Sequence, residues 1–131
     1  MGRGCLAGPV VSAAVVLKQG INLKLLKDSK KISFNKREIV SEHIKKNSHF
    51  AIGIASVQEI LKLNILNATL LSMKRAVNQL LIKPDLTLID GNFAPYGLKN
   101  CKTIINGDKK IKVISAASIV AKVFRDNLMI K

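Results

Sequence analysis

Short apolar runs alternate with helical patterns along this chain, and that alternation restricts its fold more than any other feature. Residues 10–17 are β-branched or small and predict a buried strand. Further strands are expected at residues 49–55, where Gly53 is a weak point, and at residues 85–89 and 102–105. Helical segments between short apolar strands favour an α/β fold over an all-β fold.

The helices are predicted from amphipathic stripes and from their capping residues. Residues 36–46 form a surface helix with an apolar face. Ser56 and Glu59 form a capping box that opens a short helix, and Asn64 caps a longer one that ends before Pro84. Ser115 is predicted to cap the last helix, which runs to about residue 130.

The composition indicates one folded, basic domain. A chain of 131 residues with 48% hydrophobic residues can bury a core, so residues 1–131 are treated as a single domain. Its 22 Lys and Arg against 8 Asp and Glu give a net charge of +14, which is typical of proteins that bind nucleic acid or another polyanion. Cys5 and Cys101 lack metal-pair spacing and favour a reducing, cytoplasmic location. No apolar run is long enough to span a membrane, so no membrane partner is expected.

Two aspartates follow predicted strands, where α/β folds place their sites. Asp90 ends an apolar run and precedes Gly91, and Asp108 follows Gly107 in a basic stretch. Each has two interpretations: a carboxylate presented at the end of the sheet, or an ordinary turn residue. The pattern alone leaves both open.

Three further groups of residues are candidates for phosphate contacts. Ser118, Lys122 and Asp126 are four residues apart on the last helix and share one face, which is either a phosphate-facing stripe or simply solvated. The Gly2-Arg3-Gly4 loop combines backbone N–H groups with a guanidinium. Lys30 lies in a short cluster of lysines that are either ligand contacts or solvated surface.

Taken together, these segments resemble the type 2 ribonucleases H, or ribonuclease HII. The resemblance covers nearly the whole chain and rests on blocks that occur in one order. They are Gly2-Arg3-Gly4-Cys5-Leu6-Ala7-Gly8-Pro9-Val10-Val11, Asp28-Ser29-Lys30-Lys31, Asn64-Ile65-Leu66, Leu88-Ile89-Asp90-Gly91-Asn92, Gly107-Asp108 and the helix from Ser115 to Asp126.

The resemblance implies a ribonuclease H-like fold, a five-stranded mixed sheet with flanking helices. It implies an endonuclease that cleaves the RNA strand of RNA–DNA hybrids and cuts at ribonucleotides embedded in duplex DNA, with Mn²⁺ or Mg²⁺ as cofactor. Asp90 and Asp108 match two of the family's four metal-binding carboxylates. The family loop matched by Gly2, Arg3 and Gly4 reads the RNA-to-DNA junction, where a 2′-hydroxyl distinguishes RNA from DNA.

The same resemblance assigns further nucleic-acid contacts to Lys30, Ser118 and Lys122. Asp126 matches a supporting residue of the family and is not expected to bind metal. The protein is expected to act as a monomer.

This sequence departs from the family pattern at both ends. The family has an Asp-Glu pair three and two residues before the first glycine of Gly-Arg-Gly, whereas Met1 stands directly before Gly2 here and both carboxylates are absent. The family also continues into helices beyond the position of Lys131. The strand that carries the missing pair lies in the middle of the family's sheet, so we expect an open sheet, a partial domain and impaired activity. The alternative is a non-catalytic basic nucleic-acid-binding module or a decayed remnant of the enzyme.

Overall fold

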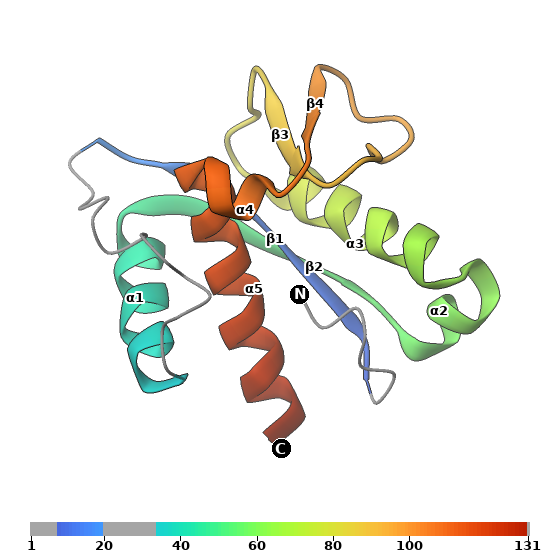
Figure 1. Ribbon diagram of the computed structural model, residues 1–131, viewed down its shortest axis with the longest axis horizontal. Helices are drawn as coiled ribbons and strands as arrows, with labels where there is room; N and C mark the ends of the chain where they lie inside the picture. The colour runs from blue at the N-terminus through green and yellow to red at the C-terminus, as the bar shows by residue number, and fades with distance from the viewer. Residues whose placement is uncertain (1–7, 20–33, 131) are drawn as a thin grey trace.

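Two small sheets form the framework of the protein. The structure is a computed structural model and describes residues 8–19 and 34–130. Strands β1 (Val10–Leu17) and β2 (Ser48–Ala55) pair antiparallel, with Val10 opposite Ala55. Strands β3 (Thr87–Asp90) and β4 (Cys101–Ile104) pair parallel, with Thr87 opposite Cys101. The described part thus has a mixed α/β fold, as the sequence predicted, and its four strands lie in two separate sheets (Figure 1).

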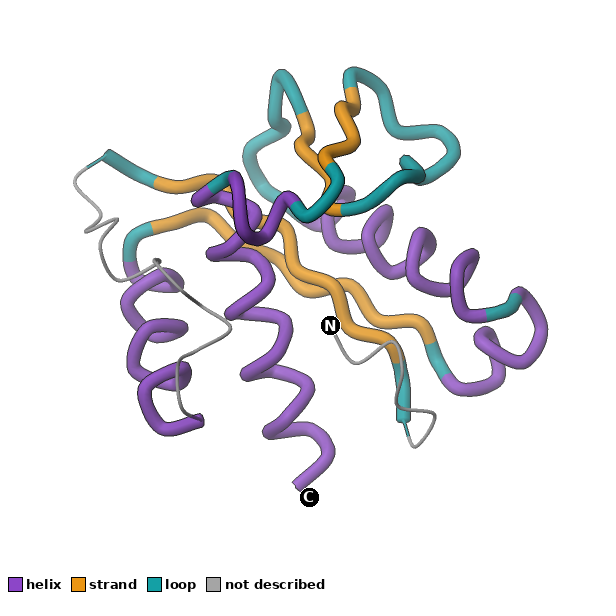
Figure 2. The backbone as a smooth tube through the Cα atoms, viewed as in Figure 1, coloured by secondary structure: helices purple, strands orange, loops and turns teal. Residues whose placement is uncertain are grey.

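Helices cover both faces of the larger sheet. They are α1 (Phe34–Lys46), α2 (Val57–Leu63), α3 (Ile65–Gln79), α4 (Gly107–Lys110) and α5 (Lys112–Ile130). Helices α1 and α5 lie on one face of β1 and β2, and α3 lies on the other (Figure 2). The smaller sheet projects above this layer, next to α4 (Figure 1).

The alternation of side chains along β1 explains this layering. Ala13, Val15 and Leu17 pack against the core cluster that α1 and α5 supply, with Ile44 and Ile119 fully buried in it. Since successive residues of a strand point to opposite faces, the residues between them face α3. A strand covered by helices on both faces needs a nearly continuous apolar sequence, which is what residues 10–17 have.

The opposite face of β1 carries a buried polar contact to α3. The hydroxyl oxygens of Ser12 and Ser72 lie 2.5 Å apart, and the Ser72 hydroxyl also donates to the carbonyl of Thr69. Both serines are buried, so these hydrogen bonds satisfy groups that would otherwise be costly to bury. The contact fixes the position of α3 along β1.

Two predicted elements differ from the structure at the C-terminal side. The prediction that Ser115 caps the last helix is wrong: α5 begins at Lys112, and the Ser115 N–H donates to the carbonyl of Ile111 at 3.0 Å. The segment from Asn106 to Asp108, which reads as a turn, opens the four-residue helix α4 instead. Between the two helices only Ile111 is extended, so α5 begins about one turn before the start predicted from Ser115.

Gly53 is a point of close approach between β2 and α3, and not merely a weak position in a strand. A Cβ at Gly53 would lie 1.9 Å from the carbonyl oxygen of Ser72 and 2.5 Å from the backbone nitrogen of Ala76. Both are backbone atoms of a packed helix, so they cannot move aside without shifting α3. The glycine therefore sets the distance between the sheet and this helix.

We expect Gly53→Ala to lower the free energy of unfolding by about 3 kcal/mol, the upper end of the usual cost of overpacking. Urea unfolding followed by circular dichroism measures this. The neighbouring Ile54→Ala, which changes a partly exposed side chain of β2, is the control and should cost clearly less. Equal midpoints for Gly53→Ala and the unchanged protein would contradict the close approach.

A charged network ties α2 and α3 to the end of β2. The Ser56 hydroxyl accepts from the Glu59 N–H, and Glu59 Oε1 accepts from the Ser56 N–H, which confirms the predicted capping box. Arg75 donates to both carboxylate oxygens of Glu59, at 2.7 and 2.6 Å, and to the carbonyl of Ile54 at 2.7 Å. The hydrogen bonds from Arg75, with help from the Ser56 N–H, lower the pKa of Glu59 from 4.5 to about 2.

This network predicts a specific loss of stability in acid. Because the folded protein holds Glu59 ionised to a lower pH than the unfolded chain does, its contribution is present above pH 4.5 and is lost as the pH falls towards 2. The urea midpoint should fall more steeply over this range in the unchanged protein than in Glu59→Gln. Glu38→Gln in α1 is the control. Parallel pH profiles for the unchanged protein and Glu59→Gln would rule out a contribution of ionised Glu59 to the stability.

Candidate metal and nucleic-acid site

Asp90 stands at the carboxyl end of β3, where the strand leaves the smaller sheet. It is the last residue of the strand, and Gly91 follows with φ +122°, a conformation that side chains rarely adopt. The Gly91 N–H donates to the carbonyl of Ile104 at 3.0 Å, which extends the pairing with β4 beyond Asp90. Asp90 is half-buried, so its carboxylate is held at the end of the sheet without being sealed from solvent.

A hydrogen bond brings the second predicted aspartate to the first. Oδ1 of Asp90 accepts from the backbone N–H of Gly107 at 2.9 Å, and Asp108 is the next residue. A Cβ at Gly107 would lie 2.7 Å from Cδ1 of Ile114, so the absence of a side chain allows α4 to approach this closely. Asp90 thus ends β3 and contacts the residue directly before Asp108, which lies in α4, shortly after β4.

Most other acidic residues of the described part are engaged elsewhere. Glu59 binds Arg75, Glu42 lies 3.7 Å from Lys45, and Asp126 lies 3.9 Å from Arg37. No group of three or more His, Cys, Asp or Glu side chains that could hold a metal ion occurs in residues 8–19 and 34–130. Asp90, by contrast, is hydrogen-bonded to the residue next to Asp108.

This donor set fits one hard cation. Mg²⁺ in particular is commonly bound by one or two carboxylates, with water and substrate phosphate as its remaining ligands. A site for two metal ions needs carboxylates to bridge and flank both ions. Two aspartates do not supply that number.

The three residues of the polar stripe predicted on α5 lie in different surroundings. Ser118 is 7% exposed and lines a groove between the two sheets. Lys122, one turn later, is half-buried, and Asp126 pairs with Arg37 of α1. This ion pair joins α5 to α1, and the supporting role of Asp126 stays a prediction. The phosphate contacts predicted for Ser118 and Lys122 stay predictions.

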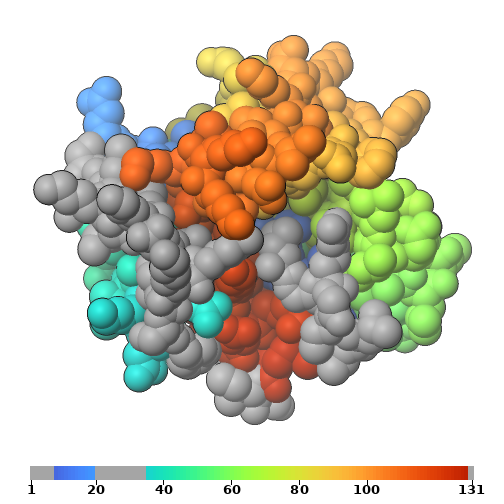
Figure 3. Space-filling view, viewed as in Figure 1, coloured from blue at the N-terminus to red at the C-terminus, as the bar shows by residue number. Residues whose placement is uncertain are grey.

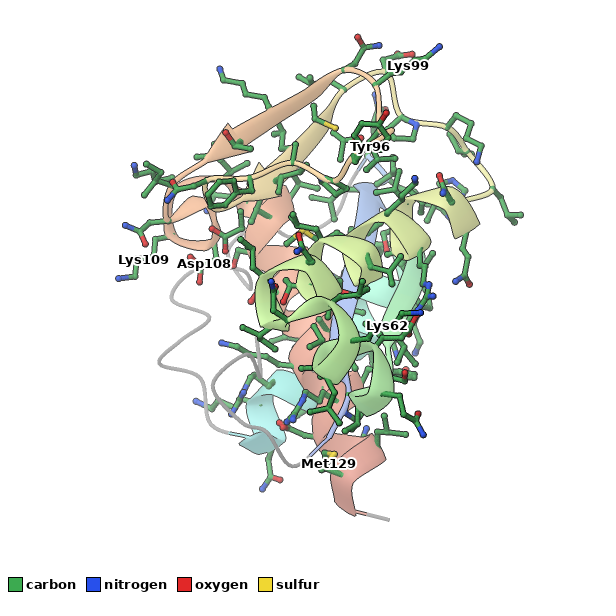
Figure 4. The ribbon with its side chains drawn as sticks, turned by 90° about the vertical axis from the view of Figure 1, so that its right-hand side faces the viewer. Lys62, Tyr96, Lys99, Asp108, Lys109 and Met129 are labelled. Atoms are coloured by element: carbon green, nitrogen blue, oxygen red, sulfur yellow. The ribbon has the colours of Figure 1, made fainter. Side chains whose placement is uncertain are left out.

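Exposed lysines follow Asp108 in the sequence. Lys109 and Lys110 follow Asp108 directly in α4, and Lys112 opens α5. Figure 4 shows Lys109 and Asp108 next to each other at one edge of the molecule, with Tyr96 and Lys99 at the far end of the smaller sheet. In the space-filling view, α4 lies above α5 and continues into the lobe formed by β3 and β4 (Figure 3). Asp108 therefore lies beside basic residues.

Four predicted contact residues, Gly2, Arg3, Gly4 and Lys30, lie outside the described residues. The Arg75–Glu59 network and the groove between the sheets were not predicted. The network had a partial signal, the capping box at Ser56, but the partner in α3 is 16 residues from Glu59.

Comparison with known proteins identifies the family. The family "Ribonuclease HII" matches residues 1–131. The chain belongs to the ribonuclease HII family. The sequence is 58% identical over 133 residues to ribonuclease HII of Pelagibacter ubique and 53% identical over 131 residues to that of Coxiella burnetii. It covers 71% and 65% of these two relatives, and 52% of the Thermotoga maritima ribonuclease HII, to which it is 50% identical.

Solved structures confirm that this is the fold of ribonuclease HII. The ribonuclease H2 of Pyrococcus horikoshii OT3 is 27% identical with a TM-score of 0.69, over 94% of this chain and 69% of that one. The ribonuclease HII in a complex with PCNA from Archaeoglobus fulgidus is 26% identical with a TM-score of 0.67, over 98% and 70%. None of the described helices is both long and apolar enough to cross a membrane.

Proposed function

We propose that this chain carries the substrate-binding surface and half of the metal site of a ribonuclease HII-type endonuclease. Its substrates are RNA–DNA hybrids and duplex DNA with embedded ribonucleotides, and the reaction is metal-dependent hydrolysis of a phosphodiester bond. The observation that supports this most directly is the Asp90–Gly107 hydrogen bond, which brings Asp108 to the end of β3 in a chain of this family.

In this proposal Asp90 and Asp108 hold Mg²⁺ or Mn²⁺. The bound ion would polarise the scissile phosphate and lower the pKa of a water molecule. The Gly107 N–H holds Oδ1 of Asp90, and Oδ2 would bind the ion. The aspartate pair thus supplies fixed negative charge at the point where a cation and a phosphate would meet.

The remaining predicted residues would position the nucleic acid. Lys30, Ser118 and Lys122 would contact backbone phosphates, which fix the register of the duplex. Gly2, Arg3 and Gly4 would contact the 2′-hydroxyl at the junction, which specifies RNA. We place this activity in the cytoplasm, in the removal of RNA from DNA during replication and repair, with the protein acting as a monomer.

We further propose that the 131-residue chain is impaired as an enzyme. Asp90 and Asp108 supply two of the four carboxylates that the resemblance implies, and the surrounding lysines oppose the binding of a cation. Loss of two anionic ligands weakens the hold on a metal ion, and water in their place carries no charge. Nucleic-acid binding does not depend on those ligands and should remain.

The test compares this chain with a chimera in which its 131 residues replace the matched span of the Pelagibacter ubique relative. The substrates are a labelled RNA–DNA hybrid and a DNA duplex with one ribonucleotide, each in Mg²⁺ and in Mn²⁺, with an all-DNA duplex as control. We expect the chimera to cut both substrates and the chain alone to cut neither. A folded chimera that binds the hybrid without cutting it would contradict the proposed endonuclease activity and would favour a non-catalytic basic nucleic-acid-binding module.

A further inference from the structure

Two asparagines in the left-handed backbone conformation flank β4. Asn100 directly precedes the strand with φ 55°, and Asn106 stands two residues after it, also with φ 55°. Residues other than glycine rarely adopt this conformation because Cβ then lies too close to a carbonyl oxygen, although asparagine tolerates it better than most. Such a conformation persists where the surrounding structure requires it, so each of the two asparagines needs an explanation.

The sheet explains the first asparagine but not the second. The carbonyl of Asn100 accepts from the N–H of Thr87 at 2.9 Å, so this residue begins the pairing of β3 with β4. Asn106 comes after β4 has ended, is exposed, and makes no side-chain hydrogen bond that caps α4. Neither strand pairing nor side-chain capping therefore accounts for the left-handed conformation of Asn106.

The peptide unit that follows Asn106 carries the N–H that holds Asp90. This unit is planar, so the direction of the Gly107 N–H is set by the dihedral angles on either side of it, of which ψ of Asn106 is 37°. In this direction the N–H donates to Oδ1 of Asp90 at 2.9 Å. If Asn106 moved to the right-handed region, the peptide unit would rotate and its N–H would turn away from the carboxylate.

Packing against α5 holds the same peptide unit from its other side. Gly107 is buried, and a Cβ there would lie 2.7 Å from Cδ1 of Ile114, which is itself only 5% exposed. The same Cβ would lie 3.4 Å from Cβ of Ile104 and 3.5 Å from Oδ1 of Asp90. Gly107 thus lies between α5, the end of β4 and Asp90, with no room for a side chain.

We propose that Asn106 is a positioning residue for Asp90: its left-handed conformation aims the Gly107 N–H at the carboxylate, and Ile114 keeps Gly107 in place. Asn106 acts only through Gly107 and touches neither an ion nor the substrate. Partners that orient a metal ligand in this way typically contribute about 10–100-fold to metal affinity or activity. That the positioned carboxylate binds a metal ion rests on the proposed function, whereas the positioning itself does not.

The first test requires no metal ion. Hydrogen exchange at the Gly107 amide is measured by nuclear magnetic resonance in the 131-residue chain. Glycine adopts the left-handed conformation freely and valine strongly disfavours it. Asn106→Val should therefore speed this exchange at least about tenfold, and Asn106→Gly should change it less than about threefold. Asn100→Val introduces the same backbone strain at the other end of β4, and as the matched control it should leave exchange at Gly107 unchanged.

The second test measures the effect on the metal ligand. In the chimera, Asn106→Val should raise the Mn²⁺ concentration for half-maximal cleavage of the hybrid about tenfold, and saturating Mn²⁺ should restore most of the rate. Asn106→Gly and Asn100→Val should keep the Mn²⁺ dependence of the unchanged chimera. A merely structural defect would instead lower the rate by the same factor at every Mn²⁺ concentration, and that result would overturn the proposal.

A compensating pair of substitutions tests the packing of Gly107. Gly107→Ala should speed exchange at the amide of residue 107, and adding Ile114→Val, which removes the Cδ1 atom that the new Cβ would meet, should restore most of the protection. If Gly107→Ala fails to fold, the Asn106 variants still decide. Unchanged exchange in Asn106→Val, or an equal effect of Asn100→Val, would overturn the proposal. An unchanged chimera that cuts nothing would contradict the proposed function instead, and exchange at Gly107 would still decide whether Asn106 positions Asp90.

Discussion

Asp90→Asn in the chimera is expected to reduce metal-dependent cleavage of an RNA–DNA hybrid at least 100-fold without changing the stability of the fold. Asparagine keeps the side-chain oxygen that accepts from the Gly107 N–H and loses only the charge. Groups that merely orient a metal ligand cost about 10–100-fold when they are removed, so loss of a ligand's charge should reach at least the upper end of that range. Initial rates at several Mn²⁺ concentrations and the urea midpoint measure the two effects separately.

Two further variants separate charge from structure. Asp90→Ala also removes the acceptor for Gly107, so it should lower both activity and stability by detaching α4 from β3. Asp85→Asn changes an exposed carboxylate in the loop before β3 and should leave both unchanged. Cleavage by Asp90→Asn at more than a tenth of the unchanged rate in saturating Mn²⁺ would remove Asp90 from the metal site.

The elements that were predicted correctly are those whose signals come from residues close together in the sequence. The apolar run of β1 and the capping box at Ser56 are local signals, and both match the structure closely. The start of α5 was misplaced because Ser115 is a good cap by composition, whereas its side chain is buried and its N–H already has a helical partner. Propensity was overridden there by packing against the core cluster of α1 and α5.

The candidate site could not be predicted from local sequence patterns alone. The sequence singled out Asp90 and Asp108, but each had an equally ordinary interpretation as a turn residue. What joins them is the parallel pairing of β3 with β4 and the Asp90–Gly107 hydrogen bond, which spans 17 residues. The groove between the sheets has no local signal, because residues of β1, of the segment that leads into β3, and of α3 and α5 line it together.

The opposite charges of the site have different consequences for binding and for cleavage. The net charge of +14 does not depend on the metal ligands, so the 131-residue chain should bind nucleic acid even if it cuts nothing. Binding that neutralises phosphates releases counterions, and the logarithm of the affinity falls linearly with the logarithm of the salt concentration. We expect such a fall on an RNA–DNA hybrid and on plain duplex DNA alike.

The lysines beside Asp108 should account for a measurable part of that slope. Replacing Lys109 and Lys110 with Gln should reduce the slope by about 2, because each lost phosphate contact removes about one unit. The matched control replaces Lys62 of α2 and Lys46 of α1, which carry the same charge at exposed positions on other helices, and should change the slope by less than about 0.5. Fluorescence anisotropy with a labelled hybrid at four salt concentrations measures both double variants. If binding uses a preferred face, phosphates lie against α4 and only the Lys109 and Lys110 double variant lowers the slope. Equal reductions in the two double variants would mean that nucleic acid binds the whole basic surface without a preferred face.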